Sequence, residues 1–429
     1  MKNLFNQTKI DYYILRITFI FFLTINFIYF YINLVENSDT NIYAFNELFI
    51  NYQAGFIRRG LLGEIAWQLN KNFFVEPRVF FSFLFLTIYF FQIILFFNLF
   101  KKFIVSRVFF IFIFFSPSLL LFHIYSPDLF FLKDAIIKLV FLFHAFIFYK
   151  FNVLKKNKSE YLEYLKFVII PILFFVVLTH EYQVFSLSLH ILISIGIAKN
   201  RKEIKEVILI YSPLLISILL VILFFGNQSQ FENLNQILNI FNVELNPYLG
   251  GSLYHYVGGF YKWHFYYFSY QDFISLFLSF ILSFLIFLIL FQYFIEKKII
   301  FFQSKHQKKY LFYFLPVLIP IILTSDHGRN LAFLSFYLVT FFSILKIDIL
   351  KFKKEINLIL KNLFKKYAVF IFIFFYVLLW KLDQVAGFRL EGKPNGIFKS
   401  SLFAEFVKFI KFIYSYIDLN IIDLPEIKL

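Results

Sequence analysis

Charged residues make up only 16% of this 429-residue chain, so those that interrupt its apolar stretches need an explanation. Lys133, Asp134 and Lys138 lie in an apolar segment that follows Ser126-Pro127. A serine before a proline is typical of a helix start, which would place Lys138 about 16 Å along the helix from Pro127. Asp134 and Lys138 would share one face and pair. This spacing is compatible with a structural ion pair and with a polar cavity.

Two adjacent arginines, Arg58 and Arg59, form a second candidate site. They are followed by Gly60 and Gly63, and glycine allows another backbone or a ligand to approach closely. Guanidinium groups bind phosphate through paired hydrogen bonds. A phosphate-binding pair and a pair of side chains that extend to a membrane interface are both compatible with the pattern.

Two further groups lie at the ends of apolar segments. Asp326, His327 and Arg329 stand at the expected start of a helix, where Asp326 can cap the helix and Arg329 can bind an anion near its N-terminus. His180 and Glu181 separate two apolar segments. Both groups are candidates for binding or acid–base chemistry, although a cap and a solvated turn would also explain them.

The elements that position these residues are long apolar segments. A run of about 20 apolar residues spans the hydrocarbon core of a bilayer as a helix, and a charged fraction of 16% is well below the roughly 25% of soluble domains. We therefore predict an all-α, polytopic membrane bundle of about eleven transmembrane helices. The expected spans are 12–34, 79–100, 104–125, 127–149, 163–179, 182–198, 206–225, 272–295, 310–324, 329–346 and 367–381.

The distribution of positive charge predicts how the bundle is oriented. Of the 42 Lys and Arg residues, 27 fall in alternate connections that share one side if every span crosses. The positive-inside rule places these connections and the N-terminus in the cytoplasm, and eleven spans leave the C-terminus outside. The net charge of +16 is thus explained by topology, so we expect no nucleic-acid partner.

The opposite connections are expected to form the working face. The transmembrane domain would cover residues 1–381, with long outer loops at 35–78 and 226–271. The outer tail, 382–429, contains an amphipathic segment at 401–417 that is expected to lie in the membrane interface. The chain has no cysteine, which excludes disulfides and thiolate chemistry.

The candidate residues would then meet at the outer side of the bundle. Three acids in the first outer loop, Glu36, Asp39 and Glu47, precede the arginine pair. Together the set offers cations for a phosphate and carboxylates for a general base or a divalent metal. We expect these side chains to line one cavity that opens to the outer face.

This layout resembles GT-C-type membrane glycosyltransferases and bacterial polysaccharide polymerases. The resemblance rests on the cytoplasmic N-terminus, the acidic first outer loop, the many spans and the outer arginines. It implies a bacterial inner-membrane protein of cell-envelope glycan assembly that transfers or polymerises polyprenyl-phosphate-linked sugars at its outer face. The implied catalytic acids are Asp39 and Glu36, which can serve as base or hold Mg²⁺ or Mn²⁺, although no Asp-x-Asp or Glu-x-Asp pair is present there.

The remaining candidates are assigned by charge and position. Asp134 and Glu181 are further candidate catalytic acids. The expected phosphate- and glycan-binding set is Arg58, Arg59, Lys133, His180, Asp326, His327 and Arg329.

Two other classes of function fit the same sequence. Asp134, Lys138, His144 and His190 would form an intramembrane ion or proton path in a transporter or flippase. In a non-catalytic membrane assembly protein, the same charges would only pair helices. We find no nucleotide-binding glycine motif and no zinc-like histidine spacing.

Overall fold

A computed structural model describes residues 9–32, 34, 43–123, 130–224, 226–239, 277, 280–284, 309–323, 327–345, 352–354, 356–358 and 376. Within these residues all regular structure is helical, as the sequence predicts. The tail, the segment 401–417 and most of the loop 226–271 lie outside them.

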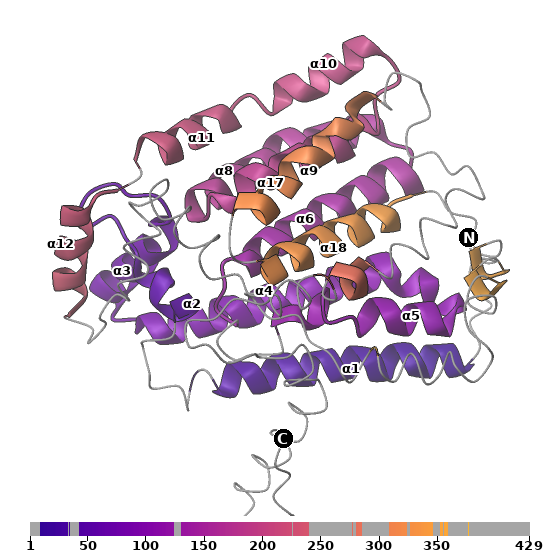
Figure 1. The fold of residues 1–429 in the computed structure, drawn as a ribbon, viewed down its shortest axis with the longest axis horizontal. Coiled ribbons are helices and arrows are strands. Elements are labelled where there is room, and N and C mark those ends of the chain that lie inside the picture. Colours follow the sequence, from indigo (N-terminus) through magenta and orange to yellow (C-terminus); the bar gives the residue numbers. More distant parts are fainter. Residues whose placement is uncertain are drawn as a thin grey trace, which may run out of the picture.

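Four helices in the described part are long and apolar enough to cross a membrane. A fifth crossing is obtained if α10 and α11 count as one bent span. Figure 1 shows the long helices running side by side along the molecule. The four spans are α1 (Lys9–Tyr31), α4 (Pro77–Phe100) continued by η3 (Lys101–Val105), α6 (Asp134–Phe148) continued by the π-helix η6 (Tyr149–Leu154), and α7 (Lys158–Tyr164) continued by η7 (Leu165–Ile169) and α8 (Ile170–Thr179).

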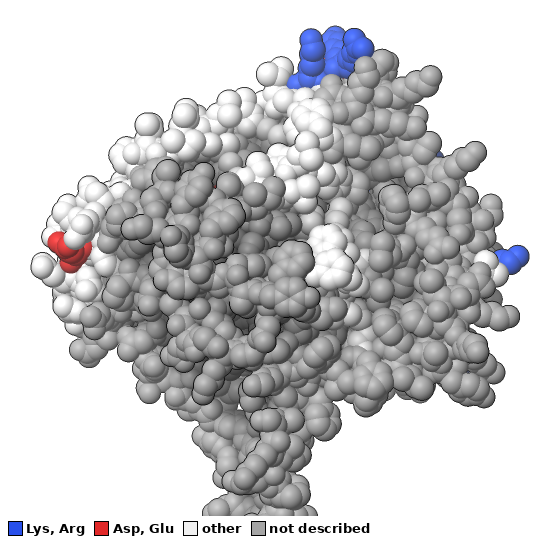
Figure 2. All heavy atoms as spheres, viewed as in Figure 1, with Lys and Arg blue, Asp and Glu red and all other residues white. Residues whose placement is uncertain are grey.

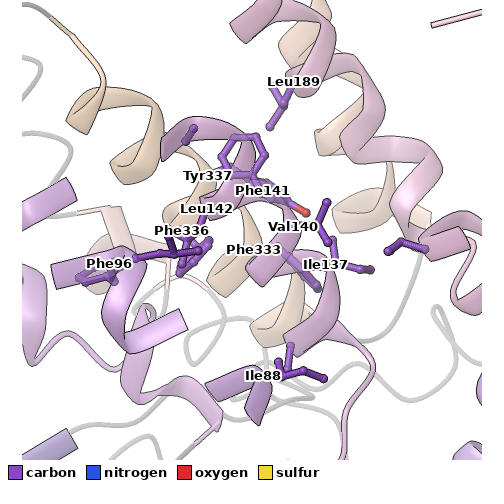
Figure 3. Packing of buried hydrophobic residues seen from close by; sticks show 14 of the residues in the cluster. Ile88, Phe96, Ile137, Val140, Phe141, Leu142, Leu189, Phe333, Phe336 and Tyr337 are labelled. Carbon is purple, nitrogen blue, oxygen red and sulfur yellow. The ribbon is translucent and has the colours of Figure 1, made fainter. Parts of the chain in front are cut away.

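Helix α6 lies at the centre of the described bundle. It contacts α4, α8, α9 (Tyr182–Ile195) and α18 (His327–Ser343). Most of its residues are buried, and the partly exposed ones form a single stripe of Ile136, Leu139, Phe143 and Phe146, as expected of a helix with neighbours on most of its sides. Figure 3 shows Phe141 of α6 packed against Tyr337 of α18, with ring centroids 4.6 Å apart, and Phe96 of α4 stacked on Phe336. Aromatic rings from three helices therefore form the core around the candidate residues.

Two expected spans are broken helices. In the region 104–125, α5 ends at Phe114 and a short 3-10 helix, η4, covers Leu120–His123. Pro117 lies in the break, and proline disfavours the helical conformation of the preceding residue. In the region 206–225, α10 (Arg201–Ile210) and α11 (Leu214–Leu223) meet at 47° beside Pro213. Average hydropathy does not detect such breaks.

Two other predictions concerned where helices start and end. Helix α8 ends at Thr179 and α9 starts at Tyr182, which confirms the predicted division there. Helix α6 begins at Asp134, so the expected start at Pro127 is wrong for this helix, and Ser126-Pro127 lies outside the described residues. Lys138 is consequently only about 6 Å from the start of its helix.

The two ends of the bundle differ in structure. At one end the connection between α1 and α4 forms α2 (Tyr43–Asn46), η2 (Glu47–Phe49) and α3 (Leu61–Phe73), and α12 (Gln228–Leu238) lies near them (Figure 1). At the other end, exposed basic residues gather over the start of α10, at the top of Figure 2, where Arg201 and Lys202 are exposed.

The short helices at the first end are tied together by backbone contacts. The amide of Arg58 donates to the carbonyl of Phe224 at 3.0 Å, which links the segment before α3 to the end of α11. Helix α3 itself packs on α4 and α8. This arrangement holds Arg58 and Arg59 against the ends of the long helices.

The η9–α17 pair completes the described fold. Helices η9 (Lys309–Phe314) and α17 (Leu315–Leu323) contact α9, and α17 also contacts α18. Asn330 of α18 donates to the carbonyl of Pro320 at 2.9 Å. These contacts fix the start of α18, which carries Arg329.

Candidate functional site

The candidate site is a buried cluster of charges with Arg59 at its centre. The Nε of Arg59 donates to both carboxylate oxygens of Glu181, at 2.7 and 2.9 Å, and Nη2 also contacts Glu181. Its Nη1 donates to Glu47 at 2.9 Å. Arg58 approaches Glu181 to 3.7 Å. Residues from three separate segments therefore form one ion-pair network.

The backbone of Arg59 adopts a conformation that is unusual for a side-chain-bearing residue. Its φ angle is 68°, in the left-handed region that costs an arginine about 1–2 kcal/mol. In this conformation the carbonyl of Arg59 accepts a hydrogen bond from Nζ of Lys133 at 3.0 Å. The guanidinium contacts and this hydrogen bond hold the strained residue in place.

The glycines beside the arginine pair allow the close approach that the sequence suggests. A Cβ at Gly60 would come within 2.4 Å of the Tyr52 ring, and one at Gly63 would lie 2.1 Å from the carbonyl oxygen of Ile50. The first turn of α3 can thus pack directly on the backbone next to η2. This packing brings Glu47 of η2 within reach of Arg59.

A second set of ionic contacts surrounds Asp134 at the start of α6. Its carboxylate lies 3.2 Å from Nε of Arg329 and 3.7 Å from Nε2 of His180. The amide of Tyr182 donates to Nδ1 of His180 at 3.2 Å, so the proton of the neutral imidazole lies on Nε2, which faces Asp134. Although Nε of Arg329 is close to Asp134, the two are not aligned as a hydrogen bond, and neither oxygen of Asp134 accepts one from the described residues.

The expected pair of Asp134 and Lys138 is replaced by tertiary contacts. Asp134 has Arg329 and His180 as its ionic contacts. The ammonium of Lys138 lies 4.7 Å from the ring centroid of Phe122 and 5.1 Å from that of Phe333. Aromatic faces attract cations at these distances, and the attraction is larger where water is excluded.

The junction of α8 and α9 positions His180 and Glu181. Helix α8 ends at Thr179, and His180 has an extended backbone, so the two side chains leave the helix axis between two packed helices. The hydroxyl of Tyr182 donates to Oδ1 of Asn330 at 2.9 Å, which ties the start of α9 to the start of α18. The same hydrogen bond places Arg329 near the junction.

The cluster is almost entirely excluded from solvent. Lys133 and Asp134 are each 1% exposed, and Arg59 is 9% exposed. Burial alone raises the pKa of Glu47, but the positive charges of Lys133 and Arg59 outweigh it and lower this pKa to about 2. Burial also acts to raise the pKa of Glu181, and Arg59 lowers it well below its ordinary value. Both carboxylates are therefore ionised and paired.

The structure brings many of the predicted site residues together. Seven of them meet in the cluster: Arg58, Arg59, Lys133, Asp134, His180, Glu181 and Arg329. Their side chains pack against one another, whereas the sequence suggested an open cavity. Glu36, Asp39 and Asp326 lie outside the described residues, and only the backbone of His327, the first residue of α18, is described.

Several members of the site were not singled out by the sequence. Glu47 was grouped with two other loop acids, yet it is the one that contacts Arg59. Tyr182 and Asn330 act through a hydrogen bond between helices that no local pattern predicts. Gln183 is fully buried, and among the described residues its side-chain amide has no partner. The sequence feature that could have identified Gln183 is its position, since it places an amide side chain in the first turn of an otherwise apolar helix.

The same residues define what the cluster can do chemically. It combines cations with carboxylates, which suits an anionic ligand next to a general base. The described part of the chain contains no group of three His, Asp or Glu side chains arranged to hold a metal ion.

The fold and the cluster define a class: a helical membrane protein with a buried charged site at one end of its bundle. Comparisons with family models, curated proteins and solved structures return no match.

Proposed function

We propose that this chain is a multi-pass membrane enzyme that transfers or polymerises lipid-linked sugars, with the charged cluster as its active site. In this proposal the bundle has about eleven spans, its N-terminus is cytoplasmic, and the cluster lies at the outer face of a bacterial inner membrane. The donor is a polyprenyl-phosphate sugar, whose lipid stays in the bilayer while its phosphate reaches the cluster.

The observation that supports this proposal is the convergence of cations and carboxylates from distant segments. The described cluster contains Glu47 and Arg59 from the first connection, Lys133 and Asp134 from the start of α6, and Glu181 from the α8–α9 junction. Even paired charges lose their hydration on burial, and this cost can equal or exceed the attraction between them, so such a network is a costly way to hold helices together. Functional sites are the usual reason for concentrating charge at membrane depth.

The geometry supports different roles for individual residues. Arg59 is fully engaged with Glu181 and Glu47, so we assign it to positioning. Asp134 receives no hydrogen bond from the described residues and has the neighbouring His180, so we assign it as the general base for an acceptor hydroxyl. Arg329 lies in the first turn of α18 and retains 11% of its side-chain surface, so we assign it to the leaving phosphate.

The test replaces these residues one at a time in the living cell. Asp134→Asn removes a charge with little change of shape, and Arg329→Gln removes the guanidinium charge but keeps a shorter polar side chain. We expect a loss of at least tenfold in long cell-surface glycan, measured as the size distribution of extracted polysaccharide, with protein levels in the membrane unchanged.

The matched control is an ion pair at the other end of the bundle. Arg107 and Asp11 are joined at 2.9 Å, and Arg107 keeps 48% of its side-chain surface. Arg107→Gln should leave the glycan unchanged. Normal glycan in both cluster variants would refute the proposal, and substrate flux into proteoliposomes that requires Asp134 would assign the cluster to a transporter instead.

A further inference from the structure

A second polar system lies deeper in the bundle and contains no charged contact. His144 of α6 and His190 of α9 face each other with their Nδ1 atoms 2.8 Å apart and their rings nearly parallel. Nε2 of His144 is 2.8 Å from the hydroxyl of Tyr161. That hydroxyl is 2.7 Å from Ser194, whose hydroxyl is 2.8 Å from Tyr211. All five side chains are buried.

The donor and acceptor of each hydrogen bond in this network can be derived from the last one, which Tyr211 makes with a backbone carbonyl. The Tyr211 hydroxyl donates to the backbone carbonyl of His190 at 2.9 Å, and a carbonyl only accepts. Tyr211 has one proton, so it must accept from Ser194. Ser194 must then accept from Tyr161, and Tyr161 from Nε2–H of His144.

The same logic fixes both histidine tautomers. Because the neutral His144 carries its proton on Nε2, its Nδ1 is an acceptor and takes the Nδ1–H of His190. Nε2 of His190 is therefore an unprotonated nitrogen. It is fully buried, and no described residue donates to it. Of the four ring nitrogens in the network, it alone has no hydrogen-bond partner among the described residues.

We propose that His144 and His190 form a buried proton-binding site, which takes up one proton at Nε2 of His190. The added proton makes an imidazolium whose Nδ1–H is shared with Nδ1 of His144, so two rings carry one charge. The hydroxyl chain beyond Tyr161 offers the proton no exit, because it ends on the backbone carbonyl of His190, which accepts a hydrogen bond but is too weak a base to take up a proton. The pair is thus a proton store and not a through-path.

The groups around the pair determine when the proton binds. Tyr161 of α7 and Tyr211, which follows α10, also belong to these surroundings. The Tyr161 hydroxyl already donates to Ser194, and the Tyr211 hydroxyl already donates to the carbonyl of His190. On another side, Phe141 of α6 contacts both His190 and Tyr337 of α18. The centroid of its ring is 5.2 Å from that of His190 and 4.6 Å from that of Tyr337. Among the described residues, the histidine that lies within ion-pair distance of carboxylates is His180, and neither His144 nor His190 has such a contact. The pair should therefore be neutral near pH 7 and take up its proton only on acidification.

The test is ¹⁵N NMR of histidine-labelled protein in lipid nanodiscs, with assignments from His144→Gln and His190→Gln. At pH 8 we expect His190 as the Nδ1–H tautomer and His144 as the Nε2–H tautomer. Between pH 8 and pH 4 we expect both to change in one transition that binds one proton. A different tautomer pair, two separate transitions, or no transition in folded protein would each overturn the proposal.

Ser194→Ala provides a second measurement that leaves both histidines in place. Without Ser194, the Tyr161 hydroxyl loses its acceptor and can donate to Nε2 of His144 instead. Both tautomers should then invert, which puts a proton on Nε2 of His190 and removes the site. The matched control is Ser188→Ala, which removes a hydroxyl that donates to a carbonyl of the same helix outside the network. Unchanged tautomers in Ser194→Ala, or inverted tautomers in Ser188→Ala, would contradict the assigned hydrogen-bond order.

Discussion

The ion pair of Arg59 and Glu181 should be strongly coupled, and a double-mutant cycle can measure this coupling. Among the described carboxylates, Glu181 accepts three contacts from Arg59 and Glu47 accepts one. Removing one partner of a buried pair leaves the other uncompensated and costs about 3–5 kcal/mol. Arg59→Met and Glu181→Gln should each reduce the free energy of unfolding by about this amount.

The double variant decides whether the two effects are linked. Once Arg59 is gone, Glu181 has lost its main counter-charge, so neutralising it removes a penalty instead of adding one. We expect the double variant to be at least about 2 kcal/mol more stable than the sum of the single effects predicts, which is within the range of measured couplings between contacting residues. The free energies are measured by reversible unfolding titrations in bicelles.

An exposed pair serves as the comparison. Lys158 and Glu203 also form an ion pair, but their side chains keep 37% and 23% of their surface. Exposed pairs contribute about 0.2–1 kcal/mol. Lys158→Met with Glu203→Gln should therefore give a coupling below about 1 kcal/mol. If the cycle at Arg59 and Glu181 were additive within about 0.5 kcal/mol, the claim that this network is held together by buried charge would be wrong.

Three other predictions concern the surroundings of the cluster. Gly63→Ala should cost about 1–3 kcal/mol of unfolding free energy, because its Cβ would lie 2.1 Å from the Ile50 carbonyl oxygen; thermal unfolding that matches the wild type would refute the close packing. The lowered pKa of Glu47 stabilises the fold above pH 4.5, and this contribution is lost as pH falls toward about 2; Tm measured from pH 6 to pH 3 should fall less in Glu47→Gln than in the wild type. Tyr182→Phe should cost about 1 kcal/mol in the same unfolding assay, because it removes the hydroxyl that donates to the buried Oδ1 of Asn330; a variant as stable as wild type would show that this hydrogen bond is dispensable.

Apolar length was sufficient to locate α1, α4, α6 and the α7–α8 span, because a membrane helix is defined mainly by a long run without charge. It failed at Pro117 and Pro213. Both prolines lie within apolar runs, and average hydropathy takes no account of the backbone geometry that proline imposes. The eleven-span topology stays a prediction.

Spacing rules identified the charged residues that meet but not their partners. The four-residue interval of Asp134 and Lys138 places both on one helix face, yet Asp134 pairs with Arg329, which is 195 positions away in the chain. Helical spacing describes neighbours on a single helix, whereas the pairing is decided by which helices pack together. Glu47 was overlooked as the partner of Arg59 for the same reason, because the close approach at Gly63 that brings them together is a tertiary contact.

The charged cluster and the histidine network offset the cost of burying polar groups in different ways. The charged cluster lies where helices start and end. Asp134 is in the first turn of α6, where the helix dipole stabilises a negative charge. The histidine network lies within the helices, where an unpaired charge is more costly, and it is neutral and almost completely hydrogen-bonded. Helix α9 belongs to both, since it follows Glu181 directly and carries His190 and Ser194.

If the helix transmits no strain, Ser194→Ala should leave the coupling of Arg59 with Glu181 unchanged, and Arg59→Met should leave the histidine tautomers unchanged. A change in either would mean that the cluster and the proton site are linked through α9, so that proton uptake would alter the geometry of the proposed active site.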